Sequence, residues 1–167
     1  MTWTNSEQIC IVNSKNEVVG KADRAVAREF RLPFRVVYII VRSRSGQFYV
    51  QRRSMQKDFS AGLLNPVTSG IVQYGEDVYS AAERELFEEM GIKDVPLQRI
   101  DTFYYSEERG SIWGTLYECT YDGELVLEKE EVDDVLLMEL DEILMRKAEF
   151  TADGMFALKR YLSAILT

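Results

Sequence analysis

Apolar runs separated by polar turns divide this chain into short elements. The stretch 34–41 is continuous, β-branched and aromatic, which is typical of a buried strand. Similar shorter runs predict strands at 9–12, 17–20, 47–51, 67–72, 97–105, 112–121 and 131–138. Helical patterns occur at 21–30, 77–90, 141–147 and 152–165. This order predicts an α/β (α+β) fold, a mixed β-sheet flanked by helices on both faces.

The length of 167 residues is typical of one domain. No repeat or Pro/Gly/Ser-rich linker divides the sequence, so we expect a single domain over 1–167 with a hairpin-and-helix extension over about 1–32. The start of the chain does not resemble a signal peptide, and the longest apolar run, 36–41, is too short to cross a bilayer. We therefore expect a cytoplasmic protein without a membrane partner.

Composition limits the chemistry that this chain can perform. It has no histidine, which excludes catalytic triads, His-ligated zinc and imidazole proton transfer. Acid–base chemistry must therefore use carboxylates, lysine, tyrosine or metal-bound water. The net charge of −8 disfavours long nucleic acids as partners. A small anionic substrate would need a local basic patch, a metal ion, or both.

The predicted helix 77–90 carries three glutamates near its C-terminal end. At about 100° per residue, Glu85, Glu88 and Glu89 share an arc of roughly 100° beside the apolar stripe. Like charges at these spacings each cost about 0.2–0.5 kcal/mol, and carboxylates in a last turn oppose the helix dipole. Arg84 is the only cation in 76–92. A divalent ion bound by the three carboxylates would remove this cost, and oxygen ligands favour Mg²⁺ or Mn²⁺.

The spacing of residues around this helix is more specific than its charge. Gly70, Glu76 and the run 84–92 match all nine specified positions of the Nudix box, G-x5-E-x7-R-E-U-x-E-E-x-G-U, where U is aliphatic. The chain thus resembles the Nudix hydrolases. This resemblance implies an αβα sandwich and a small-molecule substrate, a diphosphate linked to another group X. It also implies cleavage of the pyrophosphate bond by metal-activated water, with Mg²⁺ or Mn²⁺ as cofactor.

The resemblance also implies roles for individual residues. Glu85, Glu88 and Glu89 match metal-binding and base positions, and the identity of the general base varies within the family. Arg84 would orient the glutamates, which makes Glu85, Glu88 and Arg84 the candidate catalytic residues. The backbone carbonyl of Ser69 matches a frequent additional metal ligand.

Two more positions outside the helix are candidates. Gly70 would let its loop approach the metal and the substrate closely. Glu131 lies in the acidic run 128–134, a region where many Nudix enzymes place another metal ligand or base. An ordinary solvated acidic loop is the alternative for Glu131.

A basic run, 51–58, precedes the box and contains Arg52, Arg53 and Lys57. These cations could bind phosphate, since arginine offers paired donors and lysine a point charge; a solubilising loop is the alternative. The R-R-x3-K pattern resembles the branch that contains isopentenyl-diphosphate isomerases and related hydrolases. In that resemblance, Arg53 and Lys57 occupy positions that contact the diphosphate.

Departures from the isomerases favour hydrolysis. The isomerase cysteine would stand at Ser69, its histidine ligands cannot exist, and no carboxylate lies near Trp113. An isomerase-like enzyme and a non-catalytic nucleotide-diphosphate binding protein remain the alternatives. Tyr104, Tyr105 and Trp113 either stack on X or pack within the sheet. The identity of X, the number of metal ions and the oligomeric state, with a homodimer among the options, stay open.

Overall fold

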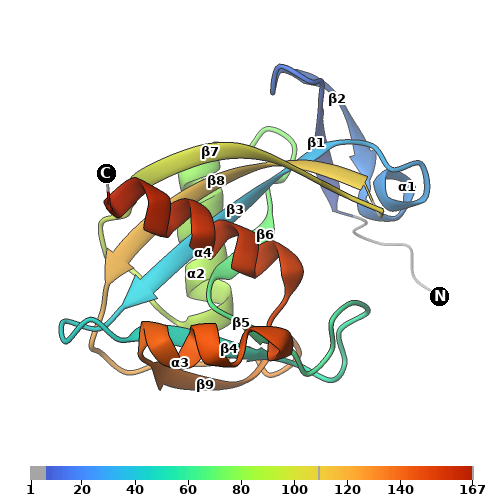
Figure 1. The fold of residues 1–167 in the computed structure, drawn as a ribbon. Helices are drawn as coiled ribbons and strands as arrows, with labels where there is room; N and C mark the ends of the chain where they lie inside the picture. Colours follow the sequence, from blue (N-terminus) through green and yellow to red (C-terminus); the bar gives the residue numbers. More distant parts are fainter. Residues whose placement is uncertain (1–6, 109, 167) are drawn as a thin grey trace.

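Two parallel strands form the centre of the fold. The computed structural model describes residues 7–108 and 110–166, and within them one mixed sheet contains nine strands (Figure 1). Strands β3 (Phe34–Arg42) and β8 (Gly110–Thr120) pair in parallel along their lengths. The other strands are β1 (Gln8–Val12), β2 (Val18–Asp23), β4 (Phe48–Arg53), β5 (Leu64–Asn65), β6 (Thr68–Ile71), β7 (Gln98–Glu107) and β9 (Val132–Met138). All of their pairings are antiparallel.

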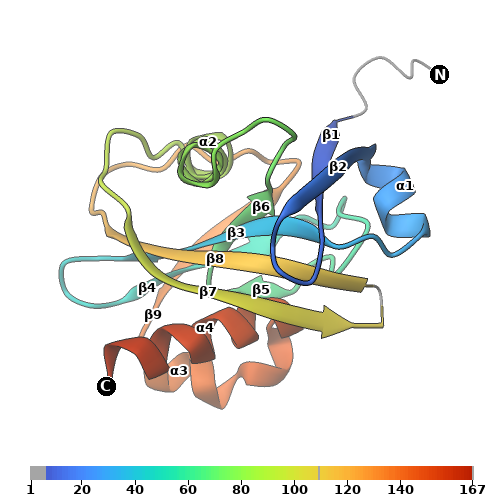
Figure 2. The same ribbon diagram turned by 90° about the horizontal axis from the view of Figure 1, so that it is seen from above.

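Helices cover both faces of this sheet, as the sequence predicts. They are α1 (Arg24–Glu29), α2 (Val78–Met90), α3 (Leu140–Met145), the 3-10 helix η1 (Lys147–Glu149) and α4 (Ala152–Ile165). Figure 2 shows α2 on one side of the sheet and α3 and α4 on the other. No helix in the described part of the chain combines the length and the apolar character needed to cross a membrane.

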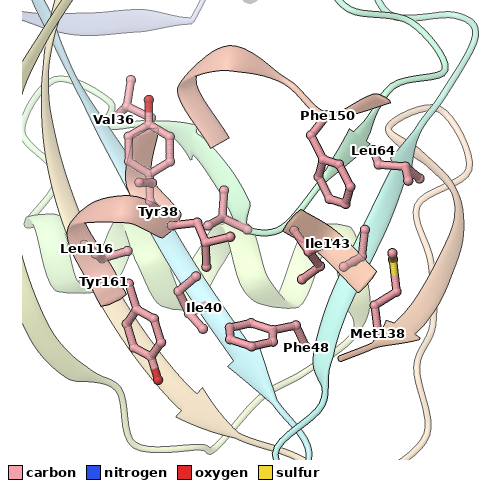
Figure 3. Packing of buried hydrophobic residues seen from close by; sticks show 14 of the residues in the cluster. Val36, Tyr38, Ile40, Phe48, Leu64, Leu116, Met138, Ile143, Phe150 and Tyr161 are labelled. Carbon is pink, nitrogen blue, oxygen red and sulfur yellow. The ribbon is translucent and has the colours of Figure 1, made fainter. Parts of the chain in front are cut away.

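Burial on both faces explains why β3 is continuously apolar. Tyr38 and Ile40 belong to the cluster of buried side chains that α4 covers (Figure 3). The alternate residues Val37 and Ile39 belong to a second cluster, which α2 covers. Strand β3 therefore contributes side chains to both hydrophobic cores, one on each face of the sheet.

Helix α2 begins and ends where its sequence predicts. The Asp77 side chain accepts a hydrogen bond from the Ser80 N–H at 3.2 Å, and Gly91 closes the helix in the left-handed region at φ 72°. This capping fixes the register of the helix, and with it the direction in which its glutamates point.

Two local predictions differ from the structure. Residues 21–23 extend β2 because they pair with β1, so α1 begins only at Arg24. The sequence predicts no strand between 51 and 67, yet the short strand β5 forms there and pairs with Gln51 and Arg52. In both places pairing with another strand outweighs local preference. The first six residues of the predicted extension 1–32 lie outside the described residues.

We expect Gly91→Ala to destabilise the fold more than Gly75→Ala. Both glycines have positive φ, which costs an alanine about 1–2 kcal/mol. A Cβ at Gly75 meets no atom within 4 Å, whereas one at Gly91 would lie 2.8 Å from Val126 Cβ and 2.9 Å from its backbone nitrogen. In Gly91→Ala this clash lowers the free energy of unfolding by about 1–3 kcal/mol more than in Gly75→Ala. Urea denaturation measures the difference. Equal losses in the two variants would contradict this packing.

Candidate active site

The candidate active site is a cleft where α2 packs against β6. Gly70 in β6 faces α2, and its missing side chain leaves room for a glutamate. A Cβ at Gly70 would lie 2.0 Å from Cδ of Glu85. The backbone of Gly70 is not in the left-handed region, so the site requires glycine for space and not for a turn. From the sequence, we expect Gly70 to let a loop approach the metal closely. In the structure, glycine is required because its missing side chain makes room for Glu85.

Arg84 connects three acidic side chains. Its Nε and Nη2 donate to the two carboxylate oxygens of Glu76 at 2.7 and 3.0 Å, and its Nη1 donates to Glu85 at 2.8 Å and Glu88 at 3.2 Å. Nη2 also donates to the Ile71 carbonyl in β6 at 3.1 Å. The hydrogen bonds to Glu76 raise the pKa of Arg84, which keeps its charge. One guanidinium therefore ties the start of the box, the helix and the sheet together.

The carboxyl of Glu76 is held as a charged partner. Burial alone would raise its pKa, but hydrogen bonds from Arg84 and from the Gln73 N–H outweigh that effect and the pKa lies below its ordinary value. Only 15% of the side chain is exposed. The pair is therefore a partly buried, bidentate ion pair.

The pKa values of Glu85 and Glu89 are raised, in contrast to that of Glu76. Burial raises the pKa of Glu85, although Arg84 partly offsets it. Glu89 is 8% exposed, and burial together with the nearby charges of Glu85 and Glu131 raises its pKa well above the ordinary value. The two carboxyls also hydrogen-bond to each other. Two buried carboxyls in contact disfavour ionisation of both, and a bound cation would favour it.

Lys57 and Glu131 form an ion pair across the cleft wall. Lys57 lies on the loop between β4 and β5, and Glu131 lies just before β9. Arg53 donates from Nε and Nη2 to the Phe59 carbonyl at 3.3 and 3.0 Å, which folds the same loop back on itself. Arg53, at the end of β4, and Lys57, in the loop that follows, therefore both lie near the acidic end of α2.

A cleft of about 710 Å³ brings the predicted site residues together. It is lined by nine of them: Arg53, Lys57, Ser69, Gly70, Arg84, Glu85, Glu88, Glu89 and Glu131. Arg52 is not brought to the cleft, because successive strand residues face opposite sides. Its Nη1 donates instead to the Gly62 carbonyl at 3.3 Å.

Sequence reasoning misses two arginines of this cleft. Arg24 and Arg28, four residues apart on α1, line the same space. The Arg28 guanidinium lies 4.2 Å from the centroid of the Phe59 ring and 3.6 Å from the Asp58 carboxylate. Their spacing in an otherwise acidic chain is the signal that could have found them. The N-terminal extension thus forms part of the site.

The donor set fits a hard divalent cation. Among residues 7–108 and 110–166, no three acidic or cysteine side chains already converge as a metal cluster. Glu85 and Glu88 are instead turned to Arg84, and Glu131 to Lys57. The buried Glu85–Glu89 pair nevertheless offers oxygen ligands, and the ion pair with Arg84 reaches Glu85 but not Glu89. A cation bound between these two carboxyls would stabilise the charged form of both.

Comparisons with known proteins establish the family. The family model of the NUDIX domain matches residues 32–158. An uncharacterized Nudix hydrolase of Yersinia pestis is 40% identical over 157 residues, covering 94% of this chain and 86% of the relative. The uncharacterized Nudix hydrolase YfcD of Escherichia coli K12 is 38% identical over 154 residues, covering 92% and 86%. This chain therefore belongs to the Nudix hydrolases, a family of enzymes that generally need a divalent metal.

Solved structures agree with the fold. DR0079 from Deinococcus radiodurans has a TM-score of 0.80 at 24% identity, covering 93% of this chain and 99% of that one. The NUDIX domain of Shewanella oneidensis NrtR, complexed with ADP ribose, has a TM-score of 0.68 at 14% identity, covering 87% and 100%. The predicted Nudix fold is confirmed, whereas these matches do not resolve the isomerase-like branch.

We expect Gly70→Ala to remove hydrolytic activity while the protein stays folded. The new methyl group occupies the position of the Glu85 carboxyl and must displace it. Misplacement of a catalytic group by about 1 Å costs about 100-fold in rate. Gly20→Ala is the matched control, because this strand glycine has open space within 4 Å. Full activity of Gly70→Ala in a steady-state assay would contradict the arrangement.

We expect Glu76→Gln to lower the free energy of unfolding at neutral pH by about 1.5–3 kcal/mol, because it replaces a charged acceptor of Arg84. The folded-state pKa of Glu76 is lowered, so its stabilisation is complete above the ordinary value of 4.5 and is lost as pH falls through the folded-state pKa. The difference from the unmodified protein should therefore shrink in acid. Urea denaturation across pH measures it, and a difference that grows below pH 4.5 would contradict the assignment.

Proposed function

We propose that this Nudix hydrolase cleaves the pyrophosphate bond of a diphosphate linked to a group X, using water and Mg²⁺ or Mn²⁺. The observation that carries the proposal is one cleft in which the three glutamates of α2 meet Lys57 and Arg53. A diphosphate needs both kinds of group, because its charge must be neutralised while water attacks. The chain as a whole is acidic, so these local cations mark where an anion can bind.

Glu85, Glu88 and Glu89 would hold the metal ion, with the Ser69 carbonyl and Glu131 as further ligands. A divalent ion bound there supplies positive charge against the phosphate oxygens. Burial restricts Glu85 and Glu89, which keeps their oxygens in fixed positions. The Lys57 partner of Glu131 can instead pair with a substrate phosphate, which would release Glu131 toward the ion.

Water activation is assigned to a carboxylate that Arg84 orients. Glu88 is the most accessible of the three glutamates, with 54% of its side chain exposed, and it lies 3.2 Å from Nη1 of Arg84. It can therefore accept a proton from the attacking water at a carboxylate oxygen. Glu85 shares the same guanidinium nitrogen and is the second candidate. Arg84 itself positions both carboxylates.

Arg53 and Lys57 are proposed to bind the diphosphate. Two bonds to the Phe59 carbonyl hold the Arg53 guanidinium in place at the cleft. Lys57 is mostly buried, with 17% of its side chain exposed, so its charge is weakly screened by solvent. The complex of the NrtR domain with ADP ribose supports a ligand of this class, since that molecule contains a diphosphate.

We expect metal-dependent phosphate or nucleotide release from a panel of nucleotide sugars, dinucleoside polyphosphates, NADH and ADP-ribose. Glu88→Gln and Glu89→Gln should each lower kcat by at least about 100-fold, because each removes a negative oxygen ligand or base. Glu83→Gln is the matched control, since Glu83 is exposed on the same helix and outside the cleft.

Three outcomes would contradict the proposal. Absence of turnover across the panel with either metal would favour the binding protein. Turnover that survives Glu88→Gln and Glu89→Gln together would place the chemistry elsewhere. Conversion of isopentenyl diphosphate to its isomer, with no hydrolysis, would favour the isomerase-like enzyme. Circular dichroism on each variant separates loss of activity from loss of folding.

A further inference from the structure

The same cleft continues past Ser69 to a second region with different chemistry. In β6, Ser69 pairs with Tyr38 and Gly70 with Val37, so neighbouring residues of the strand face opposite sides of the sheet. The acidic end of α2 lies on one side. On the other, the cleft is lined by Phe34, Tyr105 and Ile112. Glu107, which accepts from the Tyr105 hydroxyl at 3.4 Å, lines the same region, so an aromatic wall there stands beside charged groups.

The carboxylate of Asp153 is held in this region by a buried tyrosine. The hydroxyl of Tyr38 donates to Oδ2 of Asp153 at 3.1 Å, and Tyr38 is 1% exposed. In Figure 3 this hydroxyl points to the Val36 end of the cluster, away from Tyr161. Burial, reinforced by the charge of Asp153, raises the pKa of Tyr38 well above its ordinary value, so the phenol stays protonated and donates. Both residues line the cleft.

The backbone that carries Asp153 is fixed in place. Thr151 begins α4 by accepting from the Gly154 N–H at 3.2 Å, and its own N–H donates to the Leu64 carbonyl at 2.9 Å. A Cβ at Gly154 would lie 2.4 Å from Asn65 Oδ1, which shows how closely α4 begins against β5. Asp153 is therefore presented by a rigid element and not by a mobile loop.

The aromatic wall is equally well supported. The ring centroid of Tyr105 lies 4.8 Å from that of Phe156 on α4, and Phe156 in turn lies 5.2 Å from Phe103. These contacts hold Tyr105 from behind while it lines the cleft. A flat apolar group could pack against this wall without displacing it.

The combination selects among the possible X groups. A carboxylate oxygen accepts more than one hydrogen bond, so one donated by Tyr38 leaves capacity on Asp153. A purely apolar X would desolvate that carboxylate without replacing its lost hydrogen bonds. A sugar can also donate hydroxyls to Asp153, but its puckered ring covers less of a flat aromatic wall than a planar base does. A nucleobase has apolar faces and polar edges, and an exocyclic amine on its edge can donate to Asp153.

We propose that Asp153 determines specificity by accepting a hydrogen bond from the exocyclic amine of a nucleobase in X, with Tyr105 against the face of the base. This inference rests on the function proposed above, because it places X beside the diphosphate in the same cleft. It predicts that X contains adenine or cytosine, and that hypoxanthine or uracil in the same place binds more weakly.

Nucleoside monophosphates test this without metal or turnover. AMP carries an amine where IMP carries a carbonyl, and the neighbouring ring nitrogen bears a proton only in IMP. CMP and UMP differ in the same two ways. Isothermal titration calorimetry on the full chain should show at least about tenfold tighter binding of the amine member in one pair, because a site built for a donor rejects the analogue that lacks it. Equal affinities within both pairs would overturn the proposal.

Variants assign the preference to Asp153. Asp153→Asn should remove or reverse it, because the amide can donate to a carbonyl of the base. Tyr38→Phe removes the same side-chain hydrogen bond but keeps the carboxylate, so the preference should persist. A preference that survives Asp153→Asn, or that both variants abolish equally, would overturn the role of Asp153. Thermal melting of each variant reports its folding.

Failure of this inference is distinguishable from failure of the proposed function. Metal-dependent hydrolysis without an amine preference would leave the hydrolase and overturn only the role of Asp153. An amine preference without turnover would support the binding role of the pocket and contradict hydrolysis. The comparison of AMP with IMP in the unmodified protein also stands if a variant fails to fold.

Discussion

The ion-pair network of Arg84 is the constraint on which the site depends. Three glutamates near the end of one helix repel one another and oppose the helix dipole. Arg84 compensates part of this cost by binding Glu85 and Glu88, and its bidentate pair with Glu76 holds it in position. Glu89 lies outside the network and is buried against Glu85. The negative charge that Arg84 does not compensate is concentrated at the buried carboxyls of Glu85 and Glu89. A divalent ion bound there would stabilise the protein and would also act on a phosphate.

The sheet places these glutamates beside a second part of the cleft, which has an aromatic wall. Because β3 is buried on both faces, β6 can pair with it and present residues to both cores. Gly70 faces α2 and leaves space for Glu85, while Ser69 pairs with Tyr38 on the other side. One short strand therefore joins the acidic and the aromatic parts of a single cleft. This arrangement suits a ligand that is charged at one end and apolar at the other.

Much of this fold can be predicted from sequence because it follows from local patterns. The caps Asp77 and Gly91 define α2, and the nine specified residues of the box identify the family. Five of those nine residues line the cleft. Positions that depend on how strands pair with one another could not be predicted in the same way. The face on which Arg52 lies depends on how β4 pairs, and α1 begins at Arg24 only because β2 extends along β1. Asp153 is far from the box in sequence and reaches the cleft only through tertiary packing.

The central claim is that the carboxylates of α2 bind a divalent ion. Titration with Mn²⁺, followed by electron paramagnetic resonance of the free ion, tests it directly because it needs no substrate. The account predicts saturable binding to the unmodified chain and to Glu83→Gln, and at least about tenfold weaker binding to Glu89→Gln, since a buried anionic ligand is lost. Equal binding by all three proteins, or no binding even with inorganic diphosphate present, would contradict it.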